Sequence, residues 1–262
     1  MSTLTDRHVF VTAAGSGIGE AVARRALRSG ASVTAVDLAG DGIERLHDEF
    51  GERVLPVKAD MTAELDVAAA VAEAVDTFGP IDQVHNAVGG GRGMAPIVEM
   101  LVEDWDFTID LVLRSCFLVT KHTAPQITDG GAIVNVASIN SRLPHYPASS
   151  YSSAKAAVEM FTKSAALELG PRLRVNAVLP GIVRTASTAE QIAPGSPGLR
   201  AFERTTLLGR VADPDDIAGP CLFLASEDAR HITGTSLVVD AGCEIMGYPD
   251  PRDYLAATEG KK

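Results

Sequence analysis

Short apolar runs, rich in β-branched residues, alternate along the chain with longer stretches of helical periodicity. The runs HVFVTA, SVTAVD and RVLPVKAD come first, separated by GEAVARRALRSG and by a helical segment that ends near Phe50. This alternation predicts βαβ units, in which a parallel sheet is covered by helices on both faces.

The same pattern continues towards the C-terminus. It predicts an Ala-rich helix, a strand at IDQVHNA, a long helix over about 102–123, a strand at GAIVNVAS and a helix containing YSSAK, then RVNAVLP, PDDIAGPCLFLAS and SLVVDAG. No repeat, charge block or linker divides the chain. Residues 1–262 are therefore expected to form a single α/β domain of the Rossmann type, with a doubly wound parallel sheet.

Two segments depart from the alternation. The region of about 182–206 contains IAPGSPG, and this composition predicts a mobile loop with one or two short helices over the binding site. The C-terminal tail, about 244–262, is expected either to reach a neighbouring subunit's site or to fray.

Composition narrows the class of protein. The formal net charge of −11 and the pI near 5.0 argue against a nucleic-acid or anionic-membrane partner. Three distant cysteines indicate neither a disulfide framework nor a metal site. No apolar run reaches the roughly 18 residues of a membrane span, and the N-terminus carries no cleavage signal. The sequence therefore predicts a cytoplasmic protein without a bound metal.

The residues that end the predicted strands are the first candidates for function, because ligands of an open α/β sheet bind beyond the carboxyl ends of its strands. Taken singly, each is more often a turn former or a helix cap. Together they would line one edge of the sheet: Thr12, Asp37, Asp60, Asn86, Ser138 and Pro180.

A glycine-rich turn, VTAAGSGIGEA at 11–21, follows the first strand. Gly15, Gly17 and Gly19 lie between a strand and a helix, where absent side chains allow backbone N–H groups to approach a pyrophosphate. An ordinary glycine-rich turn is the alternative, and the strand–turn–helix context favours the nucleotide site.

An acid ends the second strand. Asp37 lies eighteen positions after Gly19, where a carboxylate can accept both ribose hydroxyls of an adenosine and would repel a 2′-phosphate. Neither Ser16 nor Leu38 offers a cation for such a phosphate. The sequence therefore favours NAD over NADP, and a simple turn acid is the alternative.

Tyr151 and Lys155 lie one helical turn apart, so both side chains share a face. An isolated pair of this kind is usually a surface pair. A free phenol, with a pKa of about 10, is a poor base at neutral pH, and a nearby ammonium would lower that pKa. Ser138, from a neighbouring strand end, can hydrogen-bond a substrate oxygen on which charge develops.

Seven segments, TAAGSGIG, ADM, NAVGG, NVAS, YSSAK, PGIVRT and VVDAG, together resemble the short-chain dehydrogenase/reductase family over nearly the whole chain. The resemblance implies seven parallel strands in one subunit, a nicotinamide cofactor and a homodimer or homotetramer. It also implies that Tyr151 is the catalytic acid/base, Lys155 its partner and ribose ligand, and Ser138 the hydroxyl that positions the substrate oxygen.

The resemblance also implies which residues bind the cofactor. Asp60 and Met61 would flank the adenine, 86–89 the ribose, and Pro180, Val183 and Thr185 the nicotinamide. The full set is Gly15, Ser16, Gly17, Ile18, Gly19, Asp37, Asp60, Met61, Asn86, Ala87, Gly89, Tyr151, Lys155, Pro180, Gly181, Val183 and Thr185.

The chain departs from the family pattern at two positions. Ala13 replaces a glycine, which is a modest constraint if its φ is negative. Val112 replaces an asparagine that is thought to hold a water of a proton relay from the lysine, and valine has no donor or acceptor. Backbone carbonyls or Ser115 would then have to hold that water.

Further candidates flank the expected substrate pocket. His145 and Tyr146 precede Tyr151 in a segment that should wall the pocket, and Arg92 and Arg184 are placed to meet an anionic substrate unless they are solvated surface residues.

The sequence as a whole predicts an NAD-dependent oxidoreductase that interconverts a secondary alcohol and a ketone on a small molecule. Two alternatives remain: a family relative that catalyses dehydration or epimerisation without net redox change, and an NAD(H)-binding sensor without turnover.

Overall fold

The computed structural model describes residues 3–250 and 252, and its centre is one seven-stranded sheet with the order β3-β2-β1-β4-β5-β6-β7. Every neighbouring pair in it is parallel. The predicted doubly wound sheet is therefore confirmed. Its strands are β1 (His8–Thr12), β2 (Ser32–Asp37), β3 (Val54–Lys58), β4 (Ile81–Asn86), β5 (Ile127–Val136), β6 (Arg174–Pro180) and β7 (Ser236–Val239).

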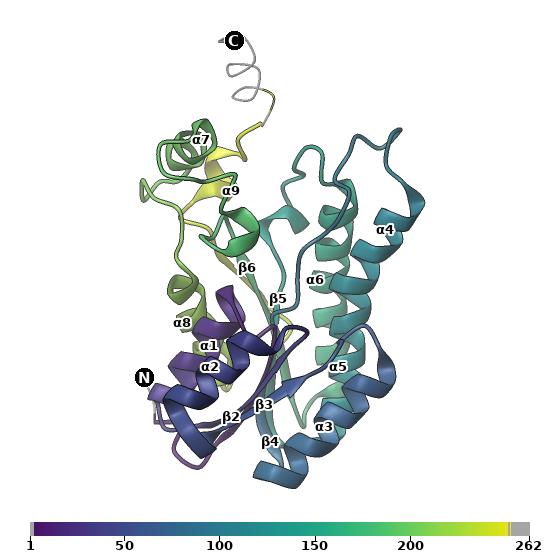
Figure 1. Ribbon diagram of the computed structural model, residues 1–262, viewed down its shortest axis with the longest axis vertical. Coiled ribbons are helices and arrows are strands. Elements are labelled where there is room, and N and C mark those ends of the chain that lie inside the picture. The colour runs from purple at the N-terminus through teal and green to yellow at the C-terminus, as the bar shows by residue number, and fades with distance from the viewer. Residues whose placement is uncertain (1–2, 251, 253–262) are drawn as a thin grey trace.

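Helices cover both faces of the sheet (Figure 1). One face carries α1 (Gly17–Arg28), α2 (Gly40–Phe50) and α8 (Pro214–Ala225), and the other carries α3 (Glu64–Phe78), α4 (Val102–Ile109), α5 (Ser115–Thr123) and α6 (Ser149–Leu169). Each face has its own buried apolar cluster, because strands buried on both sides point apolar side chains alternately into the two layers.

The helix predicted over 102–123 is present but not uniform. Asp110–Arg114 forms a π-helical turn that joins α4 to α5. A π turn holds one residue more than an α-helical turn. The apolar periodicity before and after it stays helical, so the sequence pattern does not reveal the turn.

The segment beyond the carboxyl ends of the strands has its own small core. Within 182–206 lie a single 3₁₀ turn, Ala186–Thr188, and α7 (Pro197–Thr205), which matches the short helices predicted there. Ile182, Ile192, Phe202 and Val211 form a buried cluster next to them. The tail begins with α9 (Cys243–Met246), and its part after Arg252 lies outside the described residues. No helix within 3–250 or at 252 is long and apolar enough to cross a membrane.

Candidate active site

Tyr151 and Lys155 both point from α6 towards the carboxyl end of β5. The Lys155 ammonium lies 5.7 Å from the centroid of the Tyr151 ring, and Lys155 is only 3% exposed. Its Nζ donates a 2.6 Å hydrogen bond to the backbone carbonyl of Val136, the last residue of β5. The helical spacing thus puts the phenol and the ammonium in one environment, next to a strand end.

Ser138 follows β5 and completes the group. Its hydroxyl oxygen accepts a 3.1 Å hydrogen bond from the Asn140 backbone N–H, which caps the short 3₁₀ turn after the strand. Ser138, Tyr151 and Lys155 all line one cleft of about 510 Å³, which we call the catalytic cleft. The structure therefore brings the three predicted catalytic residues together.

Burial dominates the ionisation of the pair. Burial raises the pKa of the Tyr151 phenol above its usual value, although a hydrogen bond with Ser138 works in the opposite direction. Burial also lowers the pKa of Lys155 to about 8. The predicted lowering of the phenol pKa is not found, because burial of the phenol outweighs the opposing hydrogen bond.

The glycine-rich turn enters the cleft from the other side. Gly17 has a φ of +56°, and a Cβ on it would lie 3.2 Å from the Thr185 methyl group. The N-terminus of α1 has no side-chain cap, so its first N–H groups are open to a ligand. A Cβ on Gly19 would lie 2.1 Å from the Ala13 carbonyl oxygen. The turn fits a pyrophosphate held by backbone N–H groups and the helix end.

Asp37 shapes this turn directly. One of its carboxylate oxygens accepts the Gly15 N–H at 2.9 Å, and the other accepts the Ala39 N–H at 3.0 Å. Gly42 on α2 was not anticipated from the sequence, and a Cβ there would lie 2.0 Å from the Gly15 carbonyl oxygen. Asp37 and α2 therefore hold the backbone of the first glycine in place.

Most of the predicted cofactor residues line the catalytic cleft. Those that do so are Ser16, Gly17, Ile18, Gly19, Ala87, Gly89, Tyr151, Lys155, Pro180, Gly181, Val183 and Thr185. Gly15, Asp37, Asp60, Met61 and Asn86 do not belong to its lining, and their cofactor contacts stay predictions.

Gly15 and Asp37 bond to each other, and the other three residues also have structural contacts of their own. The Asp60 carboxylate accepts both the N–H and the hydroxyl of Thr62. Met61 is 5% exposed and packs in the apolar cluster under α3. Asn86 turns inward and donates to the Asn135 side chain at 2.8 Å.

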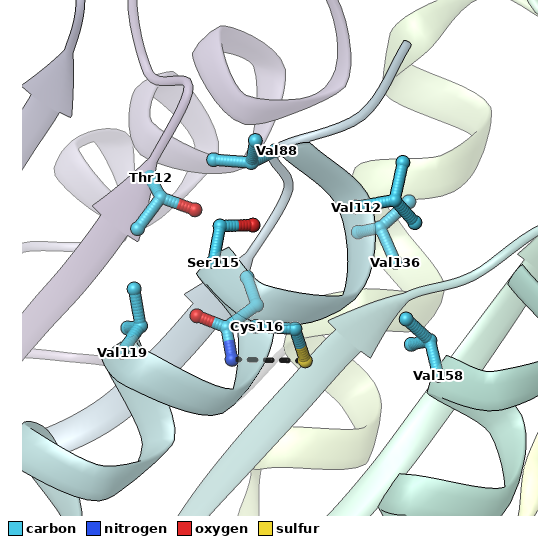
Figure 2. Close-up of a pocket in the computed structure, with 9 residues that line it drawn as sticks. Thr12, Val88, Val112, Ser115, Cys116, Val119, Val136 and Val158 are labelled. Atoms are coloured by element: carbon cyan, nitrogen blue, oxygen red, sulfur yellow. Dashed lines mark hydrogen bonds between the residues drawn. The ribbon is translucent and has the colours of Figure 1, made fainter. Parts of the chain in front are cut away.

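The two departures from the family pattern have distinct consequences. Ala13 adopts a φ of +51°, the left-handed region, so the condition of a negative φ is not met. Val112 is 1% exposed and lies in the π turn. Beside it is a cavity of about 10 Å³ that Thr12 and Ser115 also line, and the Ser115 hydroxyl points away from Thr12 (Figure 2). The Ser115 hydroxyl donates to the Leu111 carbonyl at 2.6 Å.

Of the flanking candidates, only His145 lines the catalytic cleft. Arg92 pairs with Asp104 at 2.6 Å and stacks on Phe107, and Arg184 pairs with Asp213 at 3.4 Å. Neither arginine belongs to the lining. Residues that the sequence did not single out also line the cleft, among them Met94, Asn140, Gln191 and Tyr248. They come from four separate segments, so no local pattern marks them.

Known proteins resemble this chain throughout its length. A family model described as enoyl-(acyl carrier protein) reductase matches residues 12–244. A cis-4-hydroxycyclohexanecarboxylate dehydrogenase of Sinomonas cyclohexanicum is 37% identical over 247 residues, which cover 90% of this chain and 96% of that protein. An uncharacterized short-chain type dehydrogenase/reductase of Sinorhizobium fredii is 38% identical over 93% of this chain, which spans 44% of that protein's length.

A solved structure agrees with these sequences. The 3-ketoacyl-(acyl-carrier-protein) reductase of Brucella melitensis, complexed with NADH, has a TM-score of 0.84 and 32% identity, covering 92% of this chain and 100% of that one. The chain therefore belongs to the short-chain dehydrogenase/reductase family, and it is an oxidoreductase of that type.

Proposed function

We propose that the protein is an NAD-dependent oxidoreductase that interconverts a secondary alcohol and a ketone. The observation that carries the proposal is the convergence of Ser138, Tyr151 and Lys155 in the cleft that the glycine-rich turn also enters. The relative named as a hydroxycyclohexanecarboxylate dehydrogenase and the NADH complex of a structural neighbour support the same chemistry.

Each catalytic side chain has one task in this proposal. Bound NAD would supply the hydride chemistry at the carbinol carbon. Tyr151 exchanges the proton of the substrate oxygen, and Ser138 donates a hydrogen bond to that oxygen while it carries negative charge. Lys155, held by the Val136 carbonyl, provides the positive charge beside the phenol and binds the cofactor ribose.

The proposed preference for NAD rests on Asp37. Its carboxylate ends β2 and touches the glycine turn through Gly15, so a 2′-phosphate on the adenosine ribose would meet a negative charge there. Leu38, the next residue, is 66% exposed and gives that phosphate no cation.

We also propose that the enzyme works as a homodimer or homotetramer in the cytoplasm. Exposed apolar side chains on α5 and α6, namely Phe117, Met160 and Leu167, support subunit contacts. Three unpaired cysteines support a reducing compartment. Light scattering that gives a monomer would contradict the first part.

Turnover of alcohols with NAD tests the proposed reaction. The wild-type enzyme should produce NADH from a panel of cyclic and linear secondary alcohols, and Tyr151→Phe should lower kcat by at least about 100-fold. Wild-type turnover without net NADH formation would favour dehydration or epimerisation. Tight NADH binding with no turnover of any alcohol or ketone would favour a sensor.

A further inference from the structure

The catalytic cleft has almost no charge to offer a substrate. Among the described residues that line it, Lys155 is the one lysine or arginine, and its ammonium is bonded to the Val136 carbonyl. No Asp, Glu or Arg of the described chain belongs to the lining. A carboxylate or phosphate on the substrate would be desolvated there without a free cation to pair with.

The substrate side of the cleft is bounded by two aromatic rings. His145 and Tyr248 meet edge to face with centroids 4.7 Å apart, and Tyr248 meets Phe202 in the same way at 5.2 Å. Phe202 is fully buried in the small cluster beyond the strand ends. Phe202 packs against the other side of Tyr248, so the His145 and Tyr248 rings form one edge of the catalytic cleft.

A second cavity adjoins the catalytic cleft along these two rings. It has a volume of about 600 Å³, and we call it the outer cavity. His145, Ala148 and Tyr248 line both the catalytic cleft and the outer cavity. Much of the remaining lining is apolar, including Pro96, Ile97, Val98 and Pro147, and its two charged residues, Asp250 and Arg252, form an ion pair with each other. Ile97 and Val98 are 77% and 92% exposed, so this apolar surface has no partner within the described chain.

The geometry points to a neutral secondary alcohol with an apolar body as the substrate class. Its ring or chain contacts His145 and Tyr248, and its distal end occupies the outer cavity beside Val98. This inference rests on the proposed function, and it adds that an anionic group on the substrate is selected against. Burial lowers the pKa of His145, which keeps its imidazole neutral and consistent with an uncharged ligand.

Three 4-substituted cyclohexanols test the inference: 4-methylcyclohexanol, 4-butylcyclohexanol and 4-hydroxycyclohexanecarboxylate. We expect kcat/KM with NAD to be at least about 10-fold higher for the methyl compound than for the carboxylate. The butyl compound should be used at least as well as the methyl compound, because its chain enters the outer cavity. A preference for the carboxylate, or rejection of the butyl compound, would overturn the inference.

Variants locate the contact. Tyr248→Ala should raise KM for the butyl compound about 10-fold without changing KM for NAD. Val98→Asp, at a surface position, should lower kcat/KM for the butyl compound relative to the methyl compound. Leu65→Ala removes an equally exposed apolar side chain on α3 and should change neither value. An unchanged butyl-to-methyl ratio in both Tyr248→Ala and Val98→Asp would refute the proposed binding mode.

Two further measurements separate the possible failures. If Arg92 swings into the site to bind an anion, Arg92→Ala would selectively reduce turnover of the carboxylate, and this result would also overturn the inference. Tyr151→Phe should abolish turnover of all three alcohols. If the wild-type enzyme oxidises none of these three alcohols but oxidises others of the panel, only the inference fails, and if it turns over no alcohol at all, the proposed function fails. If it oxidises the carboxylate best, only the inference fails.

Discussion

The ammonium of Lys155 donates a 2.6 Å hydrogen bond to the backbone carbonyl of Val136 while being almost completely buried. This bond fixes the position of the charge next to Tyr151, at the point where β5 ends. One neutral acceptor does not replace the hydration of an ammonium, so the arrangement lowers stability in order to position a charge.

Replacing Lys155 should therefore stabilise the protein and inactivate it. The folded pKa of about 8 lies below that of a free lysine, so above pH 8 the unfolded chain binds more protons and stability rises with pH. Lys155→Met should gain about 2 kcal/mol in the free energy of unfolding at about pH 7, and the gain should shrink towards about pH 10. Urea unfolding at both pH values measures it. Lys163→Met, at an exposed position on α6, is the control.

A buried histidine should make the fold sensitive to acid. His85 is fully buried, and its pKa is lowered to about 3 by burial. Its stabilising contribution is complete above the free pKa of about 6.5 and is lost as the pH falls towards 3, because only the unfolded chain takes up the proton.

Between about pH 7 and 5 this loss amounts to about 2 kcal/mol, and His85→Leu should remove it. Urea midpoints at the two pH values compare the variant with the wild type. His231→Leu, at an exposed position, should keep the wild-type pH dependence. Equal acid sensitivity of His85→Leu and the wild type would show that other groups control acid unfolding.

Restoring the family's asparagine should change catalysis. Val112→Asn places a donor and an acceptor beside the cavity of about 10 Å³ that Thr12 and Ser115 line. We expect a several-fold rise in kcat or a shifted pH profile, together with a loss of about 2 kcal/mol for the buried amide. Val112→Leu, which adds bulk without polarity, is the control. An unchanged kcat and pH profile would mean that the missing side chain is irrelevant here.

Removing the charge of Asp37 should weaken discrimination against NADP. Asp37→Asn should raise KM for NAD about 10-fold and improve kcat/KM for NADP, because the repulsion of a 2′-phosphate is lost. Kinetics with both cofactors give the ratio. Asp41→Asn, an exposed acid in the first turn of α2, makes the same change in net charge and should leave the ratio unchanged.

Two neighbouring alanines should respond oppositely to glycine. Ala13 has a φ of +51°, so Ala13→Gly should relieve backbone strain and add about 1 kcal/mol of stability. Ala14 is fully buried and is not among the residues with positive φ, so Ala14→Gly should destabilise the protein. Thermal unfolding of the two variants and of the wild type measures both changes in stability. Destabilisation by both would show that the methyl group of Ala13 contributes more through packing than it costs in strain.

The sequence predicted the sheet and the convergence of Tyr151, Lys155 and Ser138, because strand ends and helical spacing are local properties that parallel topology brings together. It did not predict the hydrogen bond between Lys155 and Val136, nor that burial would raise the pKa of the Tyr151 phenol. Those depend on how deeply α6 packs. Tyr248 was missed because it approaches the cleft from the far end of the chain, where no periodicity signals a binding surface.

The π turn at Asp110–Arg114 joins α4 and α5 into one continuous helix whose two halves pack on different elements. Before it, α4 packs on α6, and after it, α5 packs on α3 and β4. One residue accounts for about 100° of rotation in a regular helix, so deleting a residue from this turn would swing one half of the continuous helix out of phase with the other. Val112 lies in this turn and packs against α6, so its side chain can be exchanged while the helices on either side keep their register.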